Sequence, residues 1–368
     1  GNAFMTDIAE WIVEAGGQTG RPAQLVVDGS PPDDPRAVNL VVAPHEFYLL
    51  SDFDDRTIDR AARLAVPVCT EQPGTPWFDL GLVTARVSPL ALDINAHGVT
   101  ALRATGVDAH HLQLGAVPSM RADPADRDLD ELFLGGKTDH RSERLAGLAP
   151  VLWDRDVDIR LFSFSRPVQR GEPGLVFVAD KYELLARSRI LLNVHRGDAG
   201  PGYFEWARMV EAMANGCCIV TEPATGHEPF VAGRHFVATD DLEGAVTELL
   251  ADPERCRRIG EAARTAALEH HPLRASLAPV LDRLDRLAPP PTPRRRVPRY
   301  RRQLIVAQQH PLLPAFRPNQ PIRAELYRAL VAETALQRRI ERVRSLVRHG
   351  VDDHVEILSS PAHADASP

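Results

Sequence analysis

One segment of the sequence combines a glycine-rich loop with charged residues at regular positions. It begins with the apolar run 190–194, continues through His195 and the loop 197–202, and ends in a helical pattern over 204–215. A glycine-rich loop leading into a helix offers backbone N–H groups at the positive end of the helix dipole, which suits a diphosphate. Glu211, inside that helix, could accept hydrogen bonds from a ribose diol. An ordinary strand–helix–strand crossover with a solvent-facing glutamate fits the same spacing, so both interpretations stay open.

The elements around this segment predict an α/β protein. Helical patterns alternate with short apolar runs that end in polar or turn residues, at 24–27, 38–43, 66–69, 90–94, 111–114, 132–134, 159–164, 189–194 and 217–221. Strands buried on both faces between helices look like this, which indicates doubly wound, mostly parallel sheets. Such a fold usually opens with a strand, yet this sequence opens with a helical pattern. We therefore expect the first strand to be missing or to lie upstream.

Breaks in composition suggest where domains begin and end. The polar, acidic stretch 121–131 is typical of a linker, and a proline-rich break follows at 288–293. We predict two Rossmann-like domains and a C-terminal extension, divided as 1–128, 129–287, a Pro/Arg-rich linker at 288–321, an amphipathic helix at 322–350 and a flexible tail at 351–368.

Composition excludes several classes of protein. The 44% hydrophobic and 25% charged residues are near globular averages, which excludes a disordered or fibrous chain. No apolar stretch approaches the roughly 18 residues of a membrane span, and no secretory signal is visible. The four cysteines are few, and two of them are adjacent in the apolar run 217–220. This usage indicates buried thiols in a reducing compartment, so we expect a cytoplasmic protein.

The C-terminal region is basic although the chain as a whole carries a net charge of -7. Residues 293–349 hold fourteen arginines against three glutamates. The helical pattern at 322–350 could pack on the rest of the chain, self-associate or meet a partner helix. The arginines at 294–302 could instead contact an anionic membrane, which would make the protein peripheral at the inner face of the membrane. Nucleic acid is a less favoured partner because aromatic residues are sparse here.

The glycine-loop segment and its continuation resemble a known family. The matching residues are Arg208-x-x-Glu211-Ala-Met-Ala-Asn-Gly216, Glu222, and Gly233-x-His235-Phe236-Val237, continuing through Asp252-Pro253-Glu254 to His270. This pattern resembles the C-terminal domain of the group 1 glycosyltransferases, more closely the spore-maturation-type branch, over roughly residues 132–272. The resemblance implies a GT-B fold, in which two Rossmann-like domains face each other across a cleft. The C-terminal domain would hold a nucleotide-sugar donor and the N-terminal domain an acceptor.

The resemblance also assigns residues to the donor. Glu211 would bind the ribose, and the loop with Gly200 and Gly202 would lie over the diphosphate or the sugar. Phosphate cations would come from the loop Gly136-Lys137 with Arg141, and Arg208 belongs to the same motif. One departure stands out. The family often carries a second glutamate where this chain has Tyr203, and Glu205 or Asp198 could replace it only at a different spacing.

Candidate catalytic and acceptor-side residues follow other predicted strands. His195 ends a strand directly before the glycine loop, where it could face the cleft or simply bond to neighbouring backbone. In the N-terminal domain, His45 and Glu46 are candidate bases for deprotonating an acceptor if the reaction inverts the anomeric centre. Glu71, Asn95 and His97 also follow strands and could line the acceptor side. Each of these residues could equally be structural.

No metal or cofactor is expected. Asp52-Phe53-Asp54 matches the DxD motif of metal-dependent glycosyltransferases, but three-residue matches arise often by chance. The pairs at 110–111 and 270–271 lack partners at zinc-ligand spacing. GxxxxGK[ST] and GxGxxG motifs are absent from the sequence. Enzymes with the GT-B fold generally need no metal, so the nucleotide-sugar would be a substrate and no cofactor is predicted.

The sequence therefore predicts a metal-independent, hexosyltransferase-like glycosyltransferase. It leaves the donor, the acceptor, the oligomeric state and the choice between retention and inversion open. An inactive GT-B-fold scaffold that acts through the basic C-terminal arm is the alternative, and a nucleotide-sugar epimerase is a further one.

Overall fold

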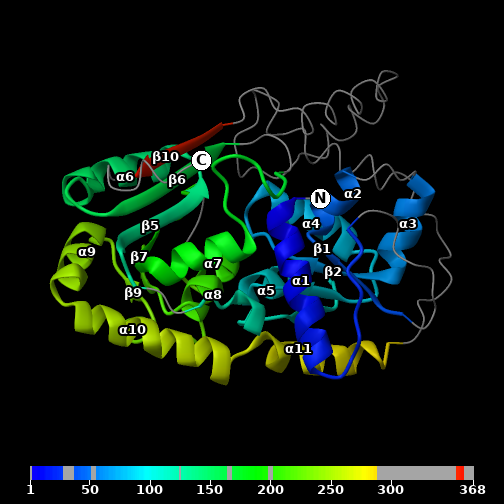
Figure 1. Ribbon diagram of the computed structural model, residues 1–368. Coiled ribbons are helices and arrows are strands. Elements are labelled where there is room, and N and C mark those ends of the chain that lie inside the picture. Colours follow the sequence, from blue (N-terminus) through cyan, green and yellow to red (C-terminus); the bar gives the residue numbers. More distant parts are fainter. Residues whose placement is uncertain are drawn as a thin grey trace, which may run out of the picture. The chain divides into compact units, whose positions relative to one another are not determined.

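The computed structural model describes residues 2–27, 37–50, 55–123, 126–163, 168–197, 202–287 and 354–359 (Figure 1). The chain divides into two compact units. The first contains the residues up to Gln113 and continues from Ser276, whereas the second runs from Leu114 to Ala275 and takes in the strand His354–Ser359. Each unit combines helices with a sheet of mainly parallel strands, which confirms the predicted α/β class.

The first unit has a four-stranded sheet in the order β1-β2-β3-β4, with every neighbouring pair parallel. Its elements are α1 (Ala3–Gln18), β1 (Asn39–Val42), α2 (Pro44–Leu50), α3 (Asp55–Leu64), β2 (Ala65–Cys69), α4 (Pro76–Ala85), β3 (Ala91–Asp93), α5 (Ala96–Ala104), β4 (Ala109–His111) and most of α11 (Leu273–Leu284). All five residues of β2 are buried, as expected for an apolar strand that is covered on both faces.

Side-chain caps fix where two helices of this unit begin. The Thr75 hydroxyl accepts the N–H of Phe78 at 3.2 Å ahead of α4. The Asn95 carboxamide accepts the N–H of His97 at 2.9 Å ahead of α5. Each cap satisfies an N–H group that the helix leaves unpaired. The chain therefore leaves β2 and β3 through short turns, which hold the residues after each strand at the carboxyl edge of the sheet.

The second unit has a six-stranded sheet in the order β10-β6-β5-β7-β8-β9 (Figure 1). Its strands are β5 (Leu129–Gly136), β6 (Val157–Ser163), β7 (Ser188–Asn193), β8 (Cys218–Thr221), β9 (Val237–Ala238) and β10 (His354–Ser359). Its helices are the 3-10 turn η1 (Pro118–Met120), α6 (Asp139–Leu152), α7 (Val178–Arg187), α8 (Trp206–Ala214), α9 (Leu242–Ala251), α10 (Pro253–Thr265) and the π-helical turn η2 (Ala266–His270). All neighbouring strands are parallel except β10, which pairs with β6 in the antiparallel sense.

Two sequence predictions of secondary structure are wrong. Residues 24–27 do not form a strand, because they make no ladder with another described strand. The tail predicted as flexible over 351–368 contains β10, whose backbone pairs with β6 from His354↔Ser163 to Ser359↔Asp158. Among the described strands, β10 covers an edge of β6 that no other strand pairs with. The predicted helix 322–350 and the predicted membrane contact at 294–302 lie outside the described residues.

The unit boundaries also differ from the predicted boundary at 128/129. Residues 114–128 belong to the second unit because Arg127 and Asn215 bind them to it: Arg127 donates to the carbonyl of Gly216 at 2.8 Å, and Asn215 donates to that of Met120 at 2.8 Å. Conversely, α11 packs with the first unit, where the Ser276 hydroxyl donates to the carbonyl of Gln113 at 2.6 Å. Ala122 and Arg127, within the polar stretch 121–131, are therefore packed against residues of the second unit.

The expected state of the cysteines is confirmed. All four are free and buried, at positions 69, 217, 218 and 256. Within the described part of the chain, no helix is both long enough and apolar enough to cross a lipid bilayer.

Candidate functional site

Three loops of the second unit meet at the carboxyl edge of its sheet. They follow β5 at Lys137-Thr138, β7 at Val194–Gly197 and β8 at Glu222-Pro223. Open α/β sheets bind their ligands at this edge, because loops from neighbouring parallel strands end there together. Of the residues predicted for the donor, Lys137 lies on one of these loops.

The turn between β5 and α6 is held by Thr138. Its hydroxyl accepts the N–H of Arg141 at 3.2 Å and donates to the carbonyl of Arg196 at 3.0 Å. Thr138 thereby caps α6 and ties its amino end to the loop after β7. Lys137 is exposed on the same turn. A cation thus lies at the positive end of the α6 dipole, the combination that attracts a phosphate.

Glu222, directly after β8, is the centre of a polar cluster that we name the Glu222 cluster (His140, Arg144, His195 and Glu222). Its carboxylate accepts from His140 Nε2 at 3.0 Å and from the His195 N–H at 2.8 Å. Arg144 Nε lies 2.9 Å from Glu222 Oε1. The side chains of His140 and Arg144 are 37% and 35% exposed, against 11% for Glu222. The carboxylate therefore orients an imidazole and a guanidinium that solvent, or a ligand, can still reach.

Arg141 is placed differently from these cations. It is 5% exposed, and its guanidinium donates to the carbonyls of Val194 at 3.0 Å and Gly136 at 2.9 Å. A third donor bonds to Glu205 Oε1 at 3.1 Å. Arg141 therefore joins the ends of β5 and β7 to the start of α8, and a role toward phosphate stays a prediction.

Glu205 and Arg208 continue that network. Arg208 pairs with the second oxygen of Glu205 and donates to Asn193 Oδ1 at 2.5 Å. The Asn193 amide in turn donates to the hydroxyl of Thr221 at 3.0 Å. Both oxygens of Glu205 are thus engaged by arginines. This carboxylate organises cations, which differs from the sugar contact considered for it from the sequence.

The part of the glycine loop that the structure describes packs tightly. A Cβ on Gly202 would lie 2.4 Å from His195 Nε2 and 2.7 Å from the carbonyl oxygen of Pro223. The His195 ring is itself hydrogen-bonded to that carbonyl at 3.0 Å. Only glycine fits this contact, so Gly202 lets the loop approach His195 closely. Tyr203 forms an isolated bridge with Thr225, and Gly200 lies outside the described residues.

Glu211 is in α8 and lies inside the second unit. Its carboxylate is 2.5 Å from the ammonium of Lys181 on α7, with side-chain exposures of 6% and 9%. The two charged groups are paired inside the unit, which offsets part of the cost of burying each of them. Lys181 was not singled out from the sequence. Nearly all the basic residues of this chain are arginines, so a rare lysine was a signal that could have pointed to Lys181.

In the first unit, four side chains lie at the carboxyl ends of three parallel strands. His45 and Glu46 come after β1, Glu71 after β2 and Asp93 ends β3. His45 Nε2 is 3.5 Å from Glu71 Oε1, and the two side chains are 2% and 24% exposed. We name these four residues the His45 cluster. It brings together three of the predicted residues, because neighbouring parallel strands end at one edge.

Burial sets the electrostatics of the His45 cluster. Burial raises the pKa of Glu46, with Glu71 adding to the rise and His45 opposing it. Burial also raises the pKa of Asp93 well above its usual value. One Asp93 oxygen accepts the N–H of Asn95 at 2.8 Å, and the other has no hydrogen-bond partner among the described residues. Such carboxyl groups favour the protonated form.

The remaining predicted residues of this unit have local roles. Asn95 caps α5, as described above, and His97 is exposed in the first turn of that helix. Among the described residues, no group of three or more His, Cys, Asp or Glu side chains could hold a metal ion. The residues Asp52-Phe53-Asp54 lie outside the described part.

Comparisons with known proteins bear on the second unit. Residues 140–282 match the family described as "Glycosyl transferase-like". No curated protein sequence matches the chain significantly.

Solved structures show weak similarity. Anabaena Alr3699/HepE in complex with UDP is 13% identical, with 68% of this chain and 79% of that chain covered and a TM-score of 0.44. Sucrose-phosphate synthase from Thermosynechococcus elongatus is also 13% identical, with 76% and 93% covered and a TM-score of 0.44. The pneumococcal O-GlcNAc transferase GtfA, in complex with UDP and GlcNAc, is 10% identical, with 62% and 54% covered and a TM-score of 0.44. The match over 140–282 runs from α6 into α11 and includes the Glu222 cluster, so this part of the chain is similar to the glycosyltransferase-like family.

Proposed function

We propose that the protein transfers a sugar from a nucleotide-sugar to an acceptor hydroxyl, and that the second unit binds the donor. The observation that carries this proposal is the Glu222 cluster beside the amino end of α6, inside the segment that matches the glycosyltransferase-like family. A diphosphate leaving group gains negative charge as the glycosidic bond breaks. Positioned cations stabilise that charge in the transition state.

His140, Arg144 and Lys137 are the groups we assign to the diphosphate. Lys137 lies directly after β5, and His140 and Arg144 lie in the first turns of α6. Glu222 orients His140 and Arg144. The diphosphate would bind the exposed donors of these side chains. The amino end of α6 adds the attraction of its dipole.

We assign Glu211 to the ribose. The Glu211 carboxylate would accept hydrogen bonds from the diol, and the buried Lys181 ammonium lies 2.5 Å from it. Lys181 thus positions Glu211, and it need not touch the nucleotide itself.

We assign proton abstraction from the acceptor to the His45 cluster. Glu71 is its most exposed member, so an acceptor hydroxyl reaches this carboxylate first. His45 Nε2 lies 3.5 Å from the Glu71 carboxylate and orients it for general base catalysis. In this scheme Glu71 takes up the proton of the acceptor hydroxyl in an inverting transfer.

Calorimetry with UDP-, GDP- and dTDP-glucose tests the donor site. At least one of these sugars should bind, and Arg144→Gln should weaken it about tenfold or more, because a hydrogen bond to a charged group contributes roughly 1.5–3 kcal/mol. Arg258→Gln is the control, since Arg258 is an exposed arginine of α10 in the same unit. Glu211→Gln is preferable to an alanine variant, because it keeps a partner for Lys181.

The outcomes separate the alternatives. Absence of binding across the three sugars would favour the inactive scaffold that acts through its basic C-terminal arm. Release of free nucleotide and an altered sugar with no acceptor present would indicate an epimerase. We further propose that transfer needs no metal, so a chelator such as EDTA should leave the rate unchanged, and a rate restored only by added Mg²⁺ or Mn²⁺ would contradict this.

A further inference from the structure

Two cysteines of the second unit meet where α10 packs on the start of β8. Cys218 is the first residue of β8, and Cys256 lies in the first turn of α10. A side-chain hydrogen bond joins their thiols. The two residues are 1% and 5% exposed, and both belong to the apolar core of the unit. Their sulfur atoms are therefore neighbours inside the protein, although the two elements are separate in sequence.

Two glycines let α10 come this close to β8. Cys256 and Gly260 are four residues apart on α10, so they lie on the same face of the helix. A Cβ on Gly260 would lie 2.2 Å from the carbonyl oxygen of Gly216, which belongs to the turn before β8. Because glycine has no Cβ, the helix backbone rests directly on this turn. The Cys256 thiol is thereby held against the sheet, where it also donates to the carbonyl of Arg189 on β7 at 3.6 Å.

Hydrogen bonding and charge distinguish the two thiols. The hydrogen bond from Cys218 lowers the pKa of Cys256, and burial opposes this effect. Arg127 and Arg189 lower the same pKa further, whereas Asp252 raises it. The hydrogen bond and burial both raise the pKa of Cys218. Since the thiolate is the nucleophilic form of cysteine, Cys256 is the member that attacks first.

We propose that Cys218 and Cys256 form an oxidation site, at which a hydroperoxide converts the two thiols into a disulfide between β8 and α10. The Cys256 thiolate attacks one peroxide oxygen, the O–O bond breaks, and the leaving oxygen takes up the thiol proton to give water or an alcohol. Cys256 is then a sulfenic acid. The Cys218 sulfur attacks the Cys256 sulfur, the S–O bond breaks, and the hydroxide leaves with the Cys218 proton as water. The peroxide accepts the two electrons that the thiols lose.

The position of the pair determines what the disulfide does. Cys218 begins β8, whereas Glu222 directly follows the last residue of that strand. The bond therefore forms at the edge of the sheet opposite the Glu222 cluster. It closes a loop between residues far apart in sequence, which restricts the unfolded chain, so oxidation should raise the urea midpoint of the second unit.

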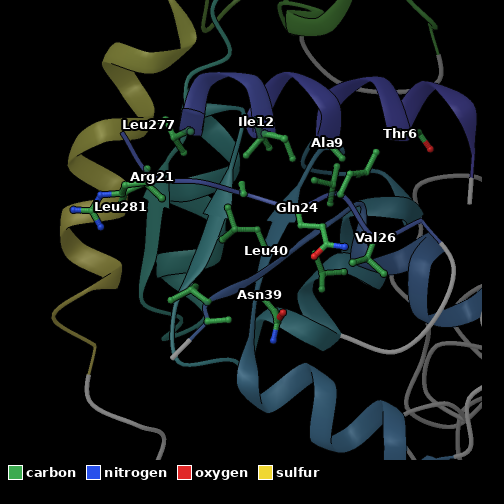
Figure 2. A pocket seen from close by; sticks show the side chains of 18 of the residues that line it. Thr6, Ala9, Ile12, Arg21, Gln24, Val26, Asn39, Leu40, Leu277 and Leu281 are labelled. Atoms are coloured by element: carbon green, nitrogen blue, oxygen red, sulfur yellow. The ribbon is translucent and has the colours of Figure 1, made fainter. Parts of the chain in front are cut away.

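Cys69 provides an internal reference in the first unit. It is the last residue of β2, and burial raises the pKa of its thiol well above the usual value. A cavity of about 630 Å³ in this unit is lined by apolar side chains, among them Ile12, Leu40 and Leu277 (Figure 2). None of the described residues along this cavity is a cysteine, so the cavity gives a peroxide no route to Cys69. Cys69 should therefore stay a thiol.

Hydrogen peroxide added to the folded full chain tests the oxidation site. Peroxide is close to water in size, so the 5% exposure of Cys256 suits it better than a larger alkylating reagent. After denaturation and alkylation with iodoacetamide, mass spectrometry should count two free thiols in place of four. A tryptic digest without reductant should contain Cys256 linked to the peptide 209–234, and dithiothreitol should restore all four thiols. Four thiols that persist in excess peroxide, or a bond that forms only in urea, would overturn the proposal.

Two matched variants identify the partner of Cys256, because Cys217 and Cys218 lie on the same tryptic peptide. Cys217→Ala should keep the cross-link. Cys218→Ala should abolish it and leave Cys256 as a sulfenic acid that dimedone captures. A cross-link lost in Cys217→Ala and kept in Cys218→Ala, or one that joins two chains, would contradict the assignment. This test needs no nucleotide-sugar, so its failure is distinct from failure of the proposed function.

Discussion

Glu131 predicts an unusual dependence of stability on pH. It lies in β5, is 1% exposed, and neither carboxylate oxygen has a hydrogen-bond partner among the described residues. Burial raises its pKa to about 8 from the model-peptide value of 4.5; Arg155 opposes the rise and Asp130 adds to it. The folded protein therefore keeps a proton at neutral pH that the unfolded chain releases.

The sign of the effect follows from proton counting. Between the two pKa values the folded state holds more protons than the unfolded state, so the free energy of unfolding falls as pH rises. Each pH unit contributes about 1.4 kcal/mol, so the full interval gives roughly 3–5 kcal/mol. This contribution is lost progressively above about pH 4.5 and is gone above about pH 8. Glu131→Gln, which cannot ionise, should abolish this slope.

Urea unfolding of the second unit measures the slope. Replacing Trp11 and Trp77 by phenylalanine leaves Trp153 and Trp206, both in the second unit, as fluorescent reporters. In that background, Glu131→Gln should match the parent near pH 5 and exceed its stability by about 3–5 kcal/mol near pH 8.5. Glu243→Gln, an exposed glutamate of α9, is the control. Parallel stability profiles for the parent and Glu131→Gln would refute the assigned protonation.

Three further predictions follow from packing and burial. Lys181→Met should destabilise the second unit by about 3–5 kcal/mol in urea unfolding, because it removes the ammonium that pairs with the buried Glu211 carboxylate. The double variant with Glu211→Leu should recover much of the loss. An unchanged unfolding midpoint for Lys181→Met would contradict this role of the ion pair. Gly202→Ala places a Cβ 2.4 Å from His195 Nε2, so the preferred nucleotide-sugar should bind more than tenfold more weakly in calorimetry. Gly147→Ala is the control and should have no effect, because the added Cβ meets no atom within 4 Å. Burial raises the pKa of the Cys217 thiol to about 12, and all four cysteines are buried. Mass spectrometry should therefore detect iodoacetamide adducts only after denaturation. Rapid labelling of the folded protein would contradict this burial.

The sequence was informative where one local pattern determines the structure. Apolar runs such as 66–69 and 189–194 predict buried strands, because both faces of a parallel sheet are covered, and the strands β2 and β7 lie there. The prediction failed at 24–27, an equally apolar run, because a strand also requires a paired neighbour, which a local pattern does not reveal. The strand β10 was missed for the complementary reason. Its place is set by the free edge of β6, far away in sequence.

The sequence likewise predicted some features of the candidate site and missed others. Placing polar residues after strands brought His45 and Glu71 together, because parallel strands share one carboxyl edge. The partner of each charge could not be predicted, since it depends on how side chains from separate elements pack. Arg141 illustrates this: its carbonyl partners come from two different strand ends. Lys181 and Glu222 acquire their importance only through the contacts that they make in space.

The path of the chain through the two units limits how the protein can be dissected. The backbone leaves the first unit after Gln113 and re-enters it at Ser276. Within that unit, Arg21 on the loop after α1 pairs with Asp282 at 2.9 Å, and Arg283 pairs with Asp108 at 2.7 Å. A fragment that stops at Gln113 would lose these salt bridges together with the leucines of α11. Separate expression of the two halves therefore calls for grafting α11 back onto the amino-terminal piece through a short designed connector.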